Sequence, residues 1–88
     1  MKISKENSLL VGFLNSEERA KITPNLKLFF EYEQQVYKLA IKDFNKIDDK
    51  IWKLIFDIPK ELNLKIDKYI NGYFAIGKIN VLNILFKV

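Results

Sequence analysis

The stretch Pro24–Ile47 carries the most regular pattern of apolar residues in this chain of 88 residues. Apolar side chains recur there at three- and four-residue steps, which is the period of an amphipathic helix with one wide apolar face. Three residues break the pattern, since Glu33 falls on the apolar face and Leu28 and Leu39 fall outside it. We predict one long central helix over this stretch, with Thr23 as its N-cap. The apolar face comprises Leu26, Phe29, Phe30, Val36, Tyr37, Ala40, Ile41, Phe44 and Ile47.

The region before this helix is predicted to hold a strand and a short helix. Ser8–Leu14 is a short apolar run that fits either a buried strand or two helical turns, and we favour the strand. Asn15 or Ser16 can cap a helix over Ser16–Ile22, because Glu18 follows Asn15 at the spacing of a capping box.

Two more helices are predicted after the central one. Asp48 and Asp49 are typical of a helix start, and they precede Lys50–Ile58, whose polar residues form only a narrow stripe. Pro59 ends that helix and fits the first turn of another, Pro59–Asn71.

The last predicted element is a C-terminal β-hairpin. Tyr73–Ile76 and Ile79–Val88 flank Gly77-Lys78, and a two-residue loop with glycine first suits a type II′ turn. The same tail also fits a helix, because three of its polar residues share a helical face. They are Asn80, Asn83 and Lys87. The predicted fold is a single α+β domain over residues 1–88, mainly helical, with shorter helices packed on the long one; an all-α bundle is the alternative.

The chain contains neither histidine nor cysteine. This removes a histidine base, a thiolate nucleophile and every zinc site built from those ligands. The loop pattern for calcium and the glycine-rich phosphate motifs are also absent, so we expect no enzyme activity and no cofactor. No apolar run reaches the roughly 20 residues of a transmembrane helix and no signal peptide is visible, so we expect a cytoplasmic protein.

Lys and Arg outnumber Asp and Glu by 15 to 11, which gives a net charge of +4. This surplus permits binding to nucleic acid or to an acidic partner, although codon usage in an A/T-rich genome would also produce it. Lys38, Lys42 and Lys46 recur four residues apart and would form one row that contacts phosphates, or a solvated helix face. The candidate binding surface comprises Lys38, Lys42, Lys46, Lys50, Lys53, Lys60, Lys65 and Lys68.

Two functional hypotheses follow. The first is a small non-enzymatic interaction protein, such as an inhibitor, an immunity factor or a small complex subunit, that binds a protein partner. The second is a nucleic-acid-binding module whose element order resembles a winged helix-turn-helix. In that module Pro59–Asn71 would be the recognition helix and Gly77-Lys78 the wing tip, although the helix lacks the Arg and Gln side chains that favour base contacts.

Overall fold

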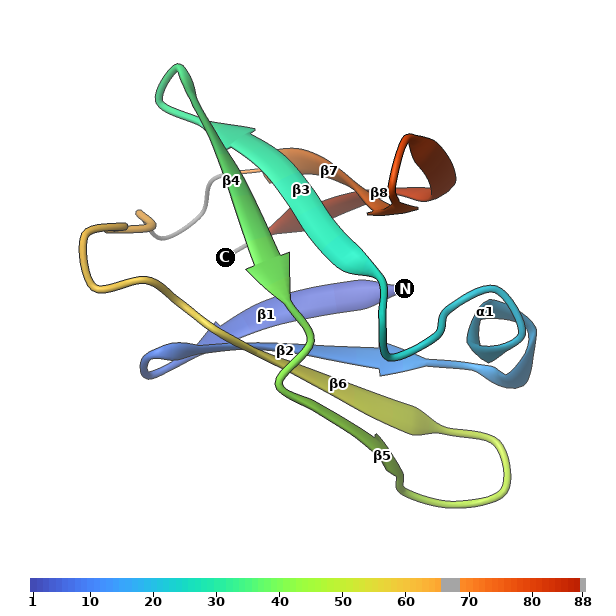
Figure 1. Cartoon of the computed structure of the whole chain (residues 1–88). Coiled ribbons are helices and arrows are strands. Elements are labelled where there is room, and N and C mark those ends of the chain that lie inside the picture. Colours follow the sequence, from blue (N-terminus) through green and yellow to red (C-terminus); the bar gives the residue numbers. More distant parts are fainter. Residues whose placement is uncertain (66–68, 88) are drawn as a thin grey trace.

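The chain forms two four-stranded antiparallel sheets that pack face to face, as the computed structural model in Figure 1 shows. The structure describes residues 1–65 and 69–87. The first sheet has the strand order β1 (Lys2–Glu6), β2 (Leu9–Leu14), β6 (Trp52–Asp57) and β5 (Asp43–Lys46). The second sheet has the order β4 (Gln35–Ala40), β3 (Lys27–Tyr32), β7 (Tyr69–Ile76) and β8 (Ile79–Lys87). A four-residue helix, α1 (Ser16–Arg19), lies between β2 and β3.

Each sheet buries alternate residues, because successive side chains of a strand point to opposite faces. In β3, Leu28 and Phe30 are buried, whereas Phe29 between them is only half-buried and Glu31 is exposed. The inner faces of the two sheets meet in one hydrophobic core, where the ring centroids of Phe56 and Phe74 lie 6.0 Å apart. No polar or charged residue is buried among residues 1, 3–65 and 69–87, whose burial the structure describes, so burial of apolar surface holds the two sheets together.

The connections by which the chain crosses between the sheets are hydrogen-bonded to the strands. After β4 it passes to β5, and the Lys42 N–H donates to the Ile55 carbonyl at 2.7 Å. After β6 it returns toward the second sheet, where the Tyr32 hydroxyl accepts a hydrogen bond from the Lys65 N–H at 2.8 Å. Leu64 in this connection is buried in the core, so the connection closes one end of the sandwich.

The predicted mainly helical fold and the all-α alternative are both wrong. The central helix predicted over Pro24–Ile47 is replaced by β3, β4 and β5 with their turns. The pattern of burial contradicts a helix, because Leu28 and Leu39 are buried although both fall outside the apolar face of the predicted helix. Buried residues along β3 recur every two residues, as in a strand. The apolar positions expected for a helix match these buried positions at only a few residues.

The predictions of two later helices, Lys50–Ile58 and Pro59–Asn71, are also wrong. Lys50–Ile58 contains the strand β6, with Leu54 and Phe56 facing the core, and the residues before it form a turn. In Pro59–Asn71, the part up to Lys65 has a turn but no helix, and β7 begins at Tyr69. The winged helix-turn-helix therefore has no recognition helix in the described part of the chain, although the hairpin proposed as its wing is present.

Three sequence predictions are confirmed. The strand favoured within Ser8–Leu14 is β2. Asn15 caps α1 in a capping box with Glu18, although the helix ends at Arg19, before Ile22. The C-terminal hairpin turns at Gly77-Lys78, where Gly77 has a positive φ of 57°. Its first strand begins earlier than predicted, at Tyr69, and Val88 lies outside the described residues.

Candidate binding face

The lysines predicted to form one binding surface lie on several different elements. Lys38 is on β4, Lys46 on β5 and Lys53 on β6. The remaining described members lie in connections, and Lys68 lies outside the described residues. They are Lys42, Lys50, Lys60 and Lys65.

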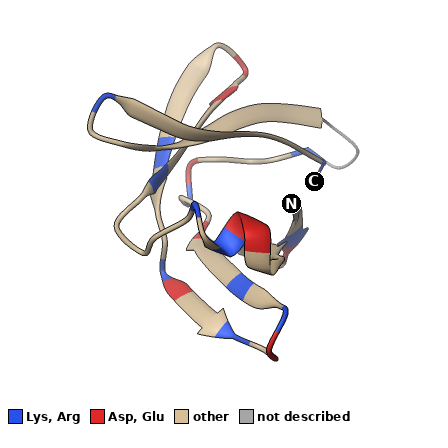
Figure 2. Cartoon of the chain, turned by 90° about the vertical axis from the view of Figure 1, so that its right-hand side faces the viewer, with Lys and Arg blue, Asp and Glu red and all other residues tan. Residues whose placement is uncertain are grey.

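Three of these lysines are engaged by nearby carboxylates. Lys42 pairs with Asp57 at 3.2 Å and Lys65 with Glu33 at 3.4 Å. Lys46 pairs with Asp49 at 3.5 Å. Figure 2 shows basic and acidic positions interspersed along the ribbon. The predicted lysine set is therefore not one surface, and Lys38 alone of its described members lies on the second sheet.

A different set of residues comes together on the outer face of the second sheet. Antiparallel partners share a face, and the register places Lys38 of β4, Phe29 of β3, Tyr73 of β7 and Asn83 of β8 in one row across all four strands. The Phe29 and Tyr73 rings stack with centroids 5.2 Å apart and planes 6° apart. The centre of this face is thus a pair of stacked rings with a lysine on one side and an amide on the other.

A second group of exposed residues extends this face along β7 and β8. Asn71 pairs with Leu85, and Tyr69 pairs with Lys87, whose ammonium lies 5.7 Å from the centroid of the Tyr69 ring. Tyr69 is 68% exposed and Leu85 is 55% exposed. The outer face therefore presents aromatic and apolar groups to solvent beside polar ones, a mixture found at interaction surfaces.

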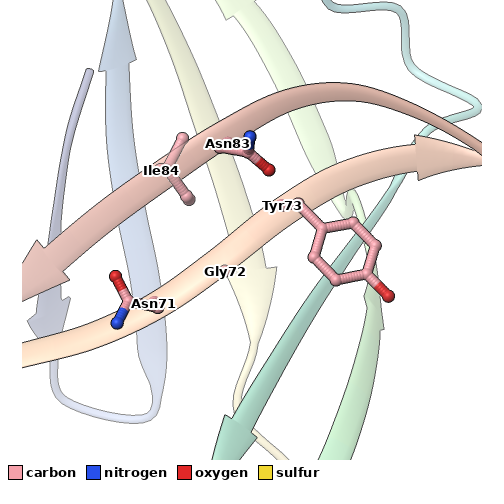
Figure 3. A pocket seen from close by; sticks show the side chains of 5 residues that line it. All are labelled: Asn71, Gly72, Tyr73, Asn83 and Ile84. Carbon is pink, nitrogen blue, oxygen red and sulfur yellow. The ribbon is translucent and has the colours of Figure 1, made fainter.

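Two hollows flank Tyr73. One, of about 240 Å³, lies between β7 and β8 and is shown in Figure 3. It is lined by Asn71, Gly72, Tyr73, Asn83 and Ile84. The other, of about 300 Å³, lies toward the hairpin turn. It is lined by Phe29, Tyr73, Ala75, Gly77, Lys78 and Asn80. Each hollow combines an aromatic ring with at least one asparagine amide, a lining suited to a planar polar ligand.

The charges on the two outer faces differ. By strand alternation, the outer face of the second sheet carries three lysines and, among the described residues, one carboxylate. They are Lys27, Lys38, Lys87 and Glu31. The outer face of the first sheet carries three carboxylates, Glu6, Asp43 and Asp57, and, among the side chains that the structure describes, one lysine, Lys53. An anionic ligand is therefore favoured at the second sheet and disfavoured at the first.

A third hollow, of about 410 Å³, lies at the end of the first sheet and is almost entirely apolar. It is lined by Met1, Phe13, Leu14, Asn15, Glu18, Ile47 and Ile51. Its carboxylate, Glu18, is already held by the Asn15 backbone and the terminal ammonium of Met1. Groups for acid–base chemistry do not converge in this hollow.

No known protein family, curated protein or solved structure matches this chain. Over residues 1–65 and 69–87, the structure brings together no group of three acidic residues that would hold a metal ion. In the same residues no helix has the length and hydropathy that crossing a bilayer requires.

Proposed function

We propose that this protein is a non-enzymatic binding module that holds a single-stranded nucleic acid on the outer face of its second sheet. The observation that carries the proposal is the stacked Phe29–Tyr73 pair at the centre of this face, with Tyr73 38% exposed and Lys38 beside the pair. This combination of ring and ammonium matches the two chemical parts of a nucleotide, its flat base and its charged phosphate.

Stacking on an exposed aromatic ring contributes about 1–3 kcal/mol per base and tolerates any base, because every base has a π-face. Lysines near the rings neutralise phosphates and release counterions, which adds affinity at low salt. A duplex hides the faces of its bases within the stack, so an aromatic sheet surface is suited to single strands. Lys27 and Lys38 supply the charge for this mode of binding.

A protein partner, the first of the sequence-based hypotheses, stays a prediction. On this face such a partner would have to be acidic, and it would bury the exposed Tyr69, Tyr73 and Leu85. We favour nucleic acid because the Tyr73 ring borders two hollows that each carry at least one asparagine amide, an arrangement suited to flat polar rings.

The test is fluorescence anisotropy of labelled oligo(dT) and oligo(U), each of roughly ten nucleotides, at about 50 mM salt. Tyr73→Leu keeps an apolar residue but removes the ring, and we expect it to weaken binding by roughly 5- to 100-fold. Phe13→Leu removes an exposed ring from the first sheet and should leave the affinity unchanged.

Two results would overturn the proposal. One is the absence of oligonucleotide binding at low salt, where counterion release makes such binding strongest. The other is equal binding of polyglutamate with the same dependence on Tyr73, which would assign the face to an acidic protein instead.

A further inference from the structure

We infer that the hollow between Asn71 and Asn83 is a base-reading pocket and that Asn71 is the residue that sets base preference, for adenine. This inference rests on the proposed function and adds specificity to it. Stacking on Phe29 and Tyr73 accepts any base, whereas the amides beside these rings can recognise the edge of one base.

The pocket is built from two neighbouring strands. Asn71 and Tyr73 project from β7 and Asn83 projects from β8 around the same hollow, as Figure 3 shows. The backbone of Gly72 and Ile84, which are paired partners, lies between them. A base in this hollow would therefore have the Tyr73 ring on one side and amide groups at its edges.

The two amides present different hydrogen-bonding groups. The Asn80 side-chain amide donates to the side-chain oxygen Oδ1 of Asn83 at 2.9 Å, which leaves the side-chain N–H groups of Asn83 for a ligand acceptor. The Asn71 side chain makes no hydrogen bond with the described residues, so both its oxygen and its N–H groups are open. Asparagine in this state pairs with the N6 and N7 atoms of adenine through two hydrogen bonds.

The spacing along β7 fits unstacked bases. Asn71, Tyr73 and Ala75 lie on the same face at intervals of about 6.7 Å, since side chains on one face are two residues apart. This interval is about twice the 3.4 Å rise between stacked nucleotides. A base in the Asn71 hollow and one at the hollow beyond Tyr73 are therefore separated from each other, and each exposes its edge, as in single-stranded RNA recognition.

The experiment compares oligo(dT) of roughly ten nucleotides with the same oligonucleotide carrying one central dA. We expect the wild-type protein to prefer the dA oligonucleotide by about five-fold or more. Asn71→Leu should abolish this preference while it retains binding to oligo(dT). Asn45→Leu, on the exposed outer face of the first sheet, should leave both affinities unchanged.

The outcomes separate the inference from the proposed function. If neither oligonucleotide binds at low salt, the proposed function fails and this inference fails with it. If both bind equally well, or if Asn71→Leu keeps the preference, the face binds nucleic acid but the pocket does not read the base, and the inference alone is overturned. Thermal unfolding of both variants checks that they fold.

Discussion

Gly72 lies opposite Phe30 on β3, at a position where a larger residue would meet the backbone of the neighbouring strand. A Cβ atom added at Gly72 would be 2.8 Å from the Phe29 carbonyl oxygen and 3.3 Å from the Phe30 Cβ. Because the nearest atom belongs to the backbone, rotation of a side chain cannot relieve the contact. The absence of a side chain at Gly72 thus allows β3 and β7 to bring Phe29 and Tyr73 into contact.

We predict that Gly72→Ala lowers the free energy of unfolding by about 1–3 kcal/mol, since the extra methyl forces a shift of the β3 backbone. Urea unfolding followed by circular dichroism measures this change. Asn71→Ala is the matched control, because it alters the exposed neighbour on the same strand and should change stability by less than about 0.5 kcal/mol. Equal stability of Gly72→Ala and the wild-type protein would contradict the prediction.

Glu18 is the second residue with a specific physical role. Burial would raise the pKa of its carboxyl group, but hydrogen bonds from the terminal ammonium and the Asn15 N–H lower it, as do the positive charges of that ammonium and of Lys21. The net effect is a pKa below the ordinary value. The ionised carboxylate therefore stabilises the folded state above the unfolded-state pKa, and this contribution is lost as the pH falls through the folded-state pKa.

We predict that Glu18→Gln lowers the melting temperature at neutral pH and that its difference from the wild-type protein narrows below about pH 4. The physical reason is that an acidic solution protonates the wild-type carboxylate and removes the same ion pair. Melting curves between neutral and acidic pH measure the difference, with Glu17→Gln as a control on the exposed side of α1. A difference that is constant with pH would show that the charge of Glu18 contributes nothing.

At the scale of elements, one hairpin turn can be predicted from the sequence and another cannot. The turn at Gly77-Lys78 is predictable, since glycine is the residue expected at a positive φ in a two-residue turn. The turn at Glu33-Gln34 is not, because both residues adopt positive φ values of 50° and 67° without being Gly, Asn or Asp. This turn is the main reason why the sequence pattern from Pro24 to Ile47 wrongly predicts one helix.

Asp48 shows a second limit of the sequence. Its carboxylate accepts hydrogen bonds from the Lys50 and Ile51 N–H groups at 2.7 and 2.9 Å. A helix N-cap makes the same kind of contact with the backbone two and three residues later, so an Asp at this spacing fits a turn and a helix start equally well. What distinguishes the two is the partner strand, since β5 and β6 pair in register, and pairing of this kind is decided by tertiary packing.

The candidate binding face was largely invisible in the sequence for a related reason. The sequence pattern assigns Phe29 and Tyr73 to apolar helix or strand faces, and only the register between β3 and β7 brings them together on the outer face. Of the described lysines predicted to bind, Lys38 is the one that belongs to this face. A signal was present in β7, where Tyr69, Asn71 and Tyr73 alternate with buried residues.

We predict that Gln34→Gly raises the free energy of unfolding by about 0.5–1 kcal/mol. Residues other than glycine are strained in the left-handed region, and the φ of 67° at Gln34 lies within it. Thermal and urea unfolding both report the change. Gln34→Ala keeps a Cβ atom and should give no gain, so a similar gain in both variants would mean that strain at this turn is not the cause.

At the scale of the whole molecule, the two sheets carry a nearly matched pair of sites with different surroundings. On the second sheet Lys38 lies opposite Phe29, and on the first sheet Lys53 lies opposite Phe13. Each is a lysine next to an aromatic ring on an outer face. The two lysine–ring pairs differ in the residues around them. The outer face of the first sheet also carries Asp43 and Asp57, whereas the stacked rings and the hollows with asparagine amides are on the second sheet.

The presence of a similar lysine–ring pair on each sheet permits a test of whether the oligonucleotide binds to the outer face of the second sheet or is attracted only by the net charge of the molecule. Affinity for oligo(dT) should fall with salt, and each lysine–phosphate contact contributes about 0.7 to the slope of log K against log salt concentration for a single strand. Lys38→Gln should reduce the slope by about that amount, because Lys38 adjoins the Phe29 ring on which bases stack. Lys53→Gln, with the same loss of charge beside Phe13, should leave the slope unchanged. Equal reductions would mean that the surplus of 15 basic over 11 acidic residues attracts the strand without orienting it on either sheet.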